Sequence, residues 1–347
     1  MKGKIDMFNK FYEGLKTFIK DHLIFLLVVL AILIVFRIPT GHVIYRPGGT
    51  IDITDRIAVN GRENSLSGSL NMVYVSMMDA TLPFYLLARI IPSWELVPNR
   101  EIVASDHETI RDANRRNRLF FEQSISLAKF LAYERSEIPF EVINERHFII
   151  FLDENASDEL YVGDEFLKFN GNVYNEINDL REYIENLTVG DIITLTIQRN
   201  NQEMEINTTI FEINGENRIG VQIITTFDIE SEQTINIDSK ATESGSSGGL
   251  MLTLAIYSTL SGEDITRGHT IVGTGTINAE AQIGRVGGIP LKVSGAVRNN
   301  ADVFLVPAGA NYEEARTYAN ARNYDIIIVG VETLDEALDF LKTLEVR

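Results

Sequence analysis

The strongest constraint on this chain is an unbroken apolar run of 14 residues from Leu23 to Phe36, LIFLLVVLAILIVF. A helix needs ~20 apolar residues to cross the ~30 Å hydrocarbon layer, so length alone fits a buried helix or the core of a signal peptide. Lys20 and Arg37 flank the run and can snorkel, which lets a tilted or membrane-thinning helix cross. The next residues, Arg37-Ile38-Pro39-Thr40, lack a small-residue cleavage site. We therefore predict an uncleaved transmembrane anchor.

Positive charge gathers before this run. The first 20 residues carry five lysines against two acids, whereas the whole chain of 347 residues has a formal net charge of −18. The positive-inside bias then places Met1 in the cytoplasm and the chain after Tyr45 outside the cell membrane. Six apolar residues before the run share one helical stripe, as in an interfacial helix: Phe8, Phe11, Tyr12, Leu15, Phe18 and Ile19. Residues 1–45 are thus predicted to form a cytoplasmic amphipathic helix and a single-pass anchor in membrane lipid.

The composition excludes several classes of function. The acidic balance argues against nucleic acid, whose phosphates need clustered Lys and Arg. The chain has no cysteine, which excludes a thiolate nucleophile, Cys-ligated zinc and disulfides. It also lacks H-E-x-x-H and G-x-x-x-x-G-K-[ST], the motifs of zinc hydrolysis and of phosphate binding. We therefore expect no metal, no cofactor and no use of ATP.

Residues 46–137 are expected to form an extracytoplasmic β/α region. Tyr45 to Gly49 predicts a turn, followed by a strand with alternating Ile51 and Ile53. Residues 72–78 predict a second strand, 83–91 a helix, and 120–133 an amphipathic helix.

Residues 138–225 change to short predicted strands with one helix, EINDLREYIENL. The segment VGDEFLKFNGNVYNEINDLREYIENLTVGDIITLTIQRNNQE resembles bacterial PDZ domains, with a Gly-Asp strand, an Asn-Gly turn, a helix and a second Gly-Asp strand. The resemblance implies a domain that binds an extended peptide at a sheet edge. A PDZ-like shell that acts only as a spacer or a lid is the alternative.

The stretch ESGSSGGL, residues 243–250, places two serines before the apolar run MLTLAIYSTL. Gly245 to Gly249 fits G-x-S-x-G, which is a weak signal by itself. An α/β-hydrolase needs an acid and then a histidine after the serine, and the only later histidine is His269, 22 residues on. A Ser-His-Asp triad is therefore excluded. Ser247 opens a predicted helix, where free backbone N–H groups can stabilise an oxyanion, although a helix cap is the other reading.

Lysine is the remaining candidate base. In GTGTINAEAQIGRVGGIPLKVSGAV a strand and a glycine turn precede a helix that carries Lys292, with Pro290 expected at the first helical position. The positive end of the helix dipole and burial both disfavour the ammonium form in the first turn. A neutral lysine can accept a serine proton.

The serine and lysine segments resemble the Lon-type protease domain, whose serine lies in G-P-S-A-G-L and whose lysine follows Gly-Gly by four positions. Gly245 to Leu250 and Gly287 to Lys292 match these patterns, and GTGTI aligns Thr274 with the threonine that in the family hydrogen-bonds the lysine. FLVPAGAN also resembles the family's strand and loop after the lysine helix. Three positions depart from the pattern: Ser246 for proline, Gly248 for alanine, and Arg285 for proline.

The order of segments resembles the YlbL-like family of membrane-bound bacterial proteases: an anchor, YRPGG just after it, a PDZ-like unit and a Lon-type domain over 226–347. The expected fold is α+β, completed after residue 300 by the strand DVFLVP, a helix near 313–321, the strand IIIVGV and a helix from Leu334. The resemblance implies an ATP-independent serine endopeptidase that cleaves peptides or flexible segments of extracytoplasmic proteins.

The residues that the resemblance assigns to this activity are Ser247 and Lys292 as the catalytic pair, Thr274 as the hydrogen-bond partner of the lysine, and Gly245, Ser246 and Ser247 as backbone groups around the oxyanion. The adjacent serines leave the register open to Ser246. A degenerate protease that only binds peptides and an unrelated esterase are the alternatives, and the sequence leaves the oligomeric state open.

Overall fold

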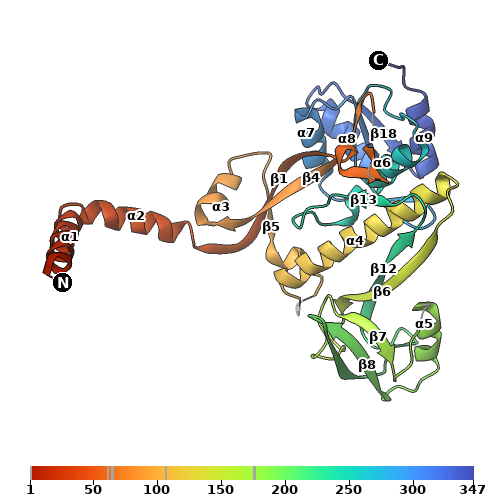
Figure 1. Ribbon diagram of the computed structural model, residues 1–347, viewed down its shortest axis with the longest axis horizontal. Coiled ribbons are helices and arrows are strands. Elements are labelled where there is room, and N and C mark those ends of the chain that lie inside the picture. The colour runs from red at the N-terminus through yellow and green to blue at the C-terminus, as the bar shows by residue number, and fades with distance from the viewer. Residues whose placement is uncertain (1, 61, 64–65, 106–107, 175–176) are drawn as a thin grey trace. The chain divides into compact units, whose positions relative to one another are not determined.

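The computed structural model describes residues 2–60, 62–63, 66–105, 108–174 and 177–347 (Figure 1). It is a mixed α+β structure whose internal contacts divide the chain into two compact units. The first unit comprises Met1–Arg46 and Met77–Asn99, and the second comprises Pro47–Ser76 and Arg100–Arg347. Two long strands, β1 (Pro39–Asp52) and β4 (Ser69–Thr81), contribute residues to both units.

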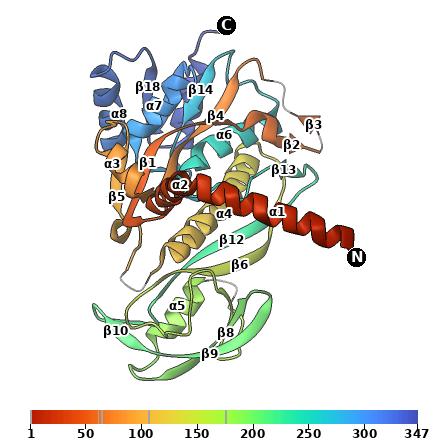
Figure 2. The ribbon, with the colours of Figure 1, turned by 90° about the vertical axis from the view of Figure 1, so that its left-hand side faces the viewer.

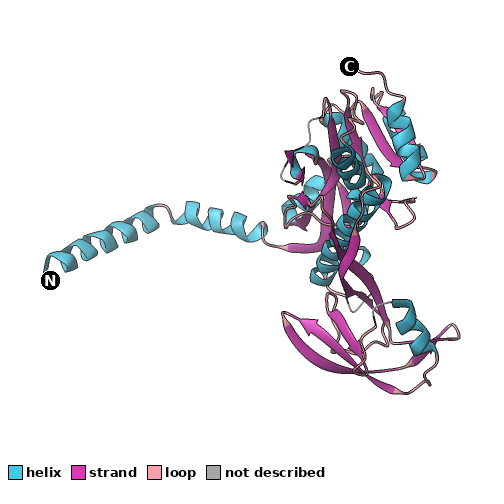
Figure 3. Cartoon of the chain, turned by 45° about the vertical axis from the view of Figure 1, so that its right-hand side comes forward, coloured by secondary structure: helices cyan, strands magenta, loops and turns pink. Residues whose placement is uncertain are grey.

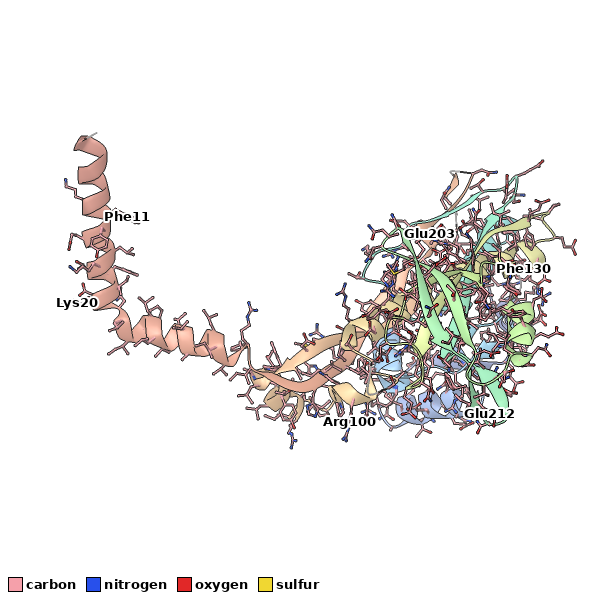
Figure 4. The ribbon with its side chains drawn as sticks, turned by 90° about the horizontal axis from the view of Figure 1, so that it is seen from below. Phe11, Lys20, Arg100, Phe130, Glu203 and Glu212 are labelled. Atoms are coloured by element: carbon pink, nitrogen blue, oxygen red, sulfur yellow. The ribbon has the colours of Figure 1, made fainter. Side chains whose placement is uncertain are left out.

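The first unit begins with two helices, α1 (Lys2–Asp21) and α2 (Leu23–Val35). None of the residues of α2 is buried, and Phe11 projects from α1 as an exposed side chain (Figure 4). Among the described residues no single helix is long and apolar enough to cross a membrane. Two consecutive helical segments, Lys10–Asp21 and Leu23–Val35, are together long and apolar enough to cross a membrane. They are bent by 76° at their junction.

The rest of the first unit is a small strand and helix assembly. It contains α3 (Leu82–Ala88) and β5 (Glu95–Pro98), which pairs antiparallel with β1 from His42 to Tyr45. Its core is formed by Ile44, Ala80 and Ala88, with partly buried aromatic residues around them. A few buried apolar side chains therefore hold this part together.

The second unit is built on the larger part of a sheet of six strands, ordered β18-β17-β14-β4-β1-β5. Its C-terminal strands are β14 (Thr270–Gly273), β17 (Val303–Pro307) and β18 (Ile327–Val331). The pairs β4/β14, β14/β17 and β17/β18 are parallel. The strands predicted from DVFLVP and IIIVGV are confirmed.

The sheet of the second unit lies between two helical layers (Figure 2). Side chains on one face pack with helices α4 (Ile110–Arg135), α6 (Gly249–Ser261) and α9 (Leu334–Lys342), and those on the other pack with α7 (Ile289–Arg298) and α8 (Ala310–Asn320). The first face holds Leu70, Met72, Ile271, Val303 and Leu305, and the second holds Val73, Val272, Phe304 and Val306. This period of two follows from the pleat of a strand.

The turn expected at Tyr45 to Gly49 is wrong, because β1 runs through these residues without a break. Pairing with β5 stops at Tyr45, before Pro47, which has no amide hydrogen to give to a ladder. A Cβ atom on Gly48 would lie 2.1 Å from the carbonyl oxygen of Tyr74. Proline and glycine at this site therefore serve close strand packing rather than a change of direction.

Residues 141–230 form a second, antiparallel sheet with the order β12-β6-β7-β8-β9 (Figure 3). Its strands are β6 (Glu141–Leu152), β7 (Glu165–Phe169), β8 (Ile192–Arg199), β9 (Gln202–Thr209) and β12 (Val221–Glu230). Helix α5 (Ile177–Glu185) packs Leu180 and Ile184 against the core of this sheet, and residues 175–176 before it lie outside the described part of the chain. The predicted order of strands and one helix is confirmed.

The aspartate of the first Gly-Asp pair, Asp164, is 1% exposed and holds the turn before β7. Its carboxylate accepts hydrogen bonds from Nε and Nη2 of Arg199, each at 2.6 Å, and from the amide of Tyr161 at 2.8 Å. These charge-assisted bonds keep the pKa of Arg199 raised.

Short elements connect these parts. They are β2 (Ile57–Val59), β3 (Arg62–Glu63), β10 (Phe211–Ile213), β11 (Glu216–Arg218), β13 (Ile235–Ile237), β15 (Thr276–Ile277), β16 (Ile283–Gly284) and the 3₁₀ turns Thr54–Arg56, Asn99–Glu101 and Ser246–Gly248. Because β2 pairs with β13, and β4 pairs with β14, residues from 47–76 join the unit that carries the serine turn. The division falls after residues 46, 76 and 99, and it leaves residues 138–225 and 226–347 in one unit.

Candidate active site

The serine segment forms a tight turn that leads directly into a helix. Gly245 has φ 85° and ψ 151°, a backbone conformation that favours glycine, and Ser246 to Gly248 make one 3₁₀ turn before α6 begins at Gly249. Ser246 and Ser247 are half-buried, and Gly248 is buried. The turn therefore presents both serines at the start of a buried apolar helix.

Close packing under this turn explains two of its glycines. A Cβ atom on Gly248 would lie 3.0 Å from Sδ of Met72, and one on Gly249 would lie 3.2 Å from the backbone nitrogen of Ile277. The alanine that the Lon-type pattern has at position 248 would press on Met72 here. Met72 would have to shift slightly to admit that alanine.

Hydrogen bonds join the serine turn to the end of β14. The carbonyl oxygen of Ser247 accepts from the amide of Gly275 at 2.8 Å and from Oγ1 of Thr274 at 3.1 Å, and the amide of Leu250 donates to the carbonyl of Gly275 at 3.1 Å. The amide of Thr274 in turn donates to the carbonyl of Leu305 at 3.0 Å. The position of Ser247 is therefore fixed against the central strands.

Lys292 lies in the first turn of α7 and reaches the same threonine. Its side chain is 4% exposed, and Nζ donates a hydrogen bond to Oγ1 of Thr274 at 2.9 Å. Burial lowers the pKa of Lys292 from 10.5 to about 8, because a buried site disfavours the charged amine. The structure brings Lys292, Thr274 and the Ser247 carbonyl into one chain of hydrogen bonds, the arrangement that the resemblance implies for the lysine and threonine.

The start of α7 differs in one detail from the expectation. The helix begins at Ile289, so Pro290 occupies its second position rather than its first. Gly288 precedes the helix with φ 69°, in the left-handed region that glycine adopts readily. Lys292 remains in the first turn, and its amide donates to the carbonyl of Gly288 at 3.0 Å.

Sequence reasoning missed Asn311 as a residue that shapes this site. Asn311 is buried; its Oδ1 accepts from the amide of Val286 at 2.9 Å, and its Nδ2 donates to the carbonyl of Val286 at 3.0 Å. This two-way contact fixes the loop that leads to Gly288 and Lys292. Asn311 is the last residue of the stretch FLVPAGAN, which resembles the Lon-type family. The resemblance therefore included this residue, but the sequence alone did not show that its amide holds Val286.

Of the three backbone amides near the serine, those of Gly245, Ser246 and Ser247, one already donates to a backbone carbonyl. The amide of Gly245 donates to the carbonyl of Asn117 on α4 at 2.7 Å, so it is already engaged. Ser246 and Ser247 occupy the first positions of a helical turn, whose amides lack partners within the turn. Within the described ranges no backbone carbonyl accepts from these two amides, so both can donate to another group.

Helix α4 also holds the loop before the serine. Arg118 Nη1 donates to the carbonyls of Lys240 at 2.9 Å and Glu243 at 3.3 Å, and the Glu243 carboxylate pairs with Arg56. On the next turns of α4, Ser126 Oγ donates to the carbonyl of Phe227 in β12 at 2.7 Å. One helix thus contacts both the serine loop and the antiparallel sheet.

His269, the histidine that follows the serine in the sequence, contacts the C-terminal part of the chain. His269 is buried and its Nε2 is 2.9 Å from the carbonyl oxygen of Glu345 near the C-terminus. The described residues contain no group of three or more His, Cys, Asp or Glu side chains placed to hold a metal ion.

In comparisons with known proteins, no family model matches the chain, and no curated protein matches it. The solved structures that match include the PDZ domain of an SdrC-like protein from Listeria monocytogenes, which is 17% identical and matches 24% of this chain and 93% of that chain with a TM-score of 0.23. A second is the second domain of another Listeria protein, 19% identical over 24% of this chain and 88% of that chain, with a TM-score of 0.22. Each likeness covers about a quarter of this chain.

Proposed function

We propose that this protein is an ATP-independent serine endopeptidase of the Lon-type, YlbL-like kind, in which Ser247 and Lys292 form the catalytic pair. The observation that carries the proposal is the buried amine of Lys292, whose pKa is lowered to about 8 and which donates to Thr274, the residue that also binds the carbonyl of Ser247. A lysine is rarely buried without an opposite charge. Burial would serve catalysis here, because a lysine that acts as a base must be neutral near the working pH and burial lowers its pKa.

In the proposed reaction, the neutral amine of Lys292 takes the proton of the Ser247 hydroxyl as the oxygen attacks the substrate carbonyl. The hydrogen bond that Nζ donates to Thr274 orients the amine and leaves its lone pair available. The negative charge on the substrate oxygen is stabilised by the amides of Ser246 and Ser247. The lysine then gives the proton to the leaving amine as the peptide C–N bond breaks. A water molecule next attacks the acyl ester of Ser247 while Lys292 takes its proton, and the lysine returns that proton to the Ser247 oxygen as the ester C–O bond breaks and the acid product leaves.

Two further parts complete the proposal. The antiparallel sheet with α5 is a PDZ-like domain that binds an extended segment of the substrate at a sheet edge. The bent helix pair of the first unit anchors the chain as a single pass in the cell membrane, with Met1 in the cytoplasm and the catalytic part outside. Substrates are then peptides or flexible segments of extracytoplasmic proteins, because the chain has no phosphate-binding motif for ATP-driven unfolding.

Cleavage of casein by the full chain in detergent, without nucleotide, tests the activity. Ser247→Ala is expected to abolish cleavage, whereas Ser246→Ala retains most of it, since only Ser247 is paired with the lysine in the proposed register. The initial rate should rise with pH through about 8 as Lys292 loses its proton.

Three other outcomes would contradict the assignment. Cleavage that requires ATP would exclude an autonomous protease. Binding of casein without cleavage by the unaltered chain would indicate a degenerate protease that only holds peptides. Full activity in Ser247→Ala with loss in Ser246→Ala would move the nucleophile by one residue.

A further inference from the structure

The first unit contains an apolar segment without acidic residues. Residues 80–94, ATLPFYLLARIIPSW, carry one charge, that of Arg89, in a chain with 49 Asp and Glu. The segment also holds the only tryptophan of the chain, Trp94. Helix α3 and the turn after it lie within this segment.

One side of this segment packs inward and the other does not. Ala88 is buried with Ile44 and Ala80 in the core of the first unit, and Trp94 packs at its margin. In contrast, Leu86, Leu87 and Ile90 are 57%, 43% and 77% exposed. Three large apolar side chains on one short helical stretch and its turn therefore face outward.

This exposed surface continues to the end of α2. The rings of Phe36 and Phe84 meet edge to face with centroids 5.8 Å apart, and the amide of Leu82 donates to the carbonyl of Ile38 at 3.0 Å. Phe36 and Ile38 are themselves exposed. The beginning of α3 is thus held next to the residues that follow the apolar helix α2.

We propose that the outer face of α3 and its following turn, formed by Leu86, Leu87 and Ile90, lies in the interfacial layer of a lipid bilayer. The proposal rests on the anchoring role proposed above for the helix pair, because α2 and α3 would then meet the same membrane. Apolar side chains of interfacial helices enter the boundary between headgroups and acyl chains by ~5–10 Å. The first unit would therefore be held to lipid at two places.

The chemistry of the segment favours lipid over a protein partner. Arg89 Nη2 donates to the Tyr85 hydroxyl at 2.6 Å, and its guanidinium lies 5.1 Å from the centroid of that ring. An arginine beside a tyrosine at the edge of an apolar surface is typical of membrane interfaces, where cations meet lipid phosphates and amphipathic rings sit at headgroup level. Residues 80–94 contain no acidic residue, and the nearest acids, the exposed Asp79 and Glu95, lie at the two ends of the segment rather than within α3 and its turn.

Tryptophan fluorescence of the full chain in vesicles tests the proposal, because Trp94 is the only tryptophan. The vesicles contain phosphatidylcholine and phosphatidylglycerol, with plain or brominated acyl chains, and flotation first shows whether the protein is bound to them. In a Trp94→Phe background, Ile90→Trp places the probe on the proposed surface, and Leu87→Trp gives a second position. The matched control is Ile192→Trp, since Ile192 in the antiparallel sheet is 73% exposed.

The expected result is loss of Ile90→Trp and Leu87→Trp emission in brominated vesicles and protection of both from acrylamide. Ile192→Trp should keep its emission in brominated vesicles and be quenched by acrylamide. Protein that floats with vesicles but whose probes at 87 and 90 are quenched only by acrylamide would overturn the docking while the anchor stands. Probes protected from both quenchers would indicate a protein contact, such as a second copy, and would also overturn it. Failure to float would instead refute the anchor itself.

Discussion

Replacing Lys292 by Met tests whether burial of this amine destabilises the fold. The pKa of Lys292 is 10.5 in its ordinary state and about 8 in the folded chain. At a pH between these two pKa values, Lys292 is protonated in the unfolded chain and neutral in the folded chain. The loss of folding stability caused by burying this amine is therefore complete below about pH 8 and disappears as the pH rises to 10.5. At ~1.4 kcal/mol for each tenfold change, the difference corresponds to about 3 kcal/mol.

The substitution removes this penalty and one hydrogen bond. Methionine has a similar length and no charge, and Thr274 keeps its own bond to the carbonyl of Ser247. The lost bond from Nζ to Thr274 offsets about 1 kcal/mol of the gain. We expect Lys292→Met to be inactive and more stable than the unaltered chain by about 2 kcal/mol at pH 7.

Urea unfolding followed by circular dichroism at pH 7 and pH 10 measures this effect. The stability advantage of Lys292→Met should shrink by about 2 to 3 kcal/mol between the two pH values, and comparison within each pH removes the titration of all other groups. Lys342→Met, at an exposed lysine, serves as the control and should show no such change. An advantage that is the same at pH 7 and pH 10 would refute the lowered pKa.

Three other predictions concern packing, positioning and topology. Gly249→Ala should destabilise the chain by about 1–3 kcal/mol in urea unfolding, because its Cβ would lie 3.0 Å from an isoleucine methyl, whereas Gly287→Ala, with open space around it, should change stability little. Asn311→Ala removes both hydrogen bonds to Val286 and should cost about 2 kcal/mol of stability and lower kcat for casein; unchanged kcat would show that the loop keeps its shape without the amide. Protease added to intact cells should digest a C-terminal tag and spare a tag at Met1, and the reverse pattern would overturn the proposed orientation.

The local elements of the C-terminal part were predictable because each carries its own pattern. The runs DVFLVP and IIIVGV are short and apolar, as buried parallel strands are, and they form β17 and β18. Glycine at 288 with proline at 290 marked the start of α7, and Thr333 before Leu334 marks the start of α9 as a cap. The sequence predicted these elements correctly because residues within each segment determine its conformation.

Contacts between distant segments had no such signal. Nothing in the sequence of β4 indicates that it pairs with β14, or that Asn117 accepts a hydrogen bond from Gly245. The turn predicted at Tyr45 to Gly49 was wrong for the same reason. Proline and glycine usually end a strand, and here the glycine instead allows close packing against Tyr74, which is distant in the sequence. Lys292 was a candidate because of its place at a predicted helix start, whereas Thr274 came from the family resemblance alone.

The position of β4 in the sheet also sets the order in which this protein can fold. Ser69 pairs with Thr270, so closing that contact joins positions roughly 200 residues apart and costs about 5 kcal/mol of chain entropy before any pairing offsets it. A ribosome would release β4, with its neighbour β1, long before β14 exists, so the parallel pair of β4 and β14 must form late. A fragment of residues 226–347 would likewise expose the edge of β14 that β4 covers and would tend to associate through it. Folding of the serine and lysine site is therefore one of the last events in the synthesis of this chain.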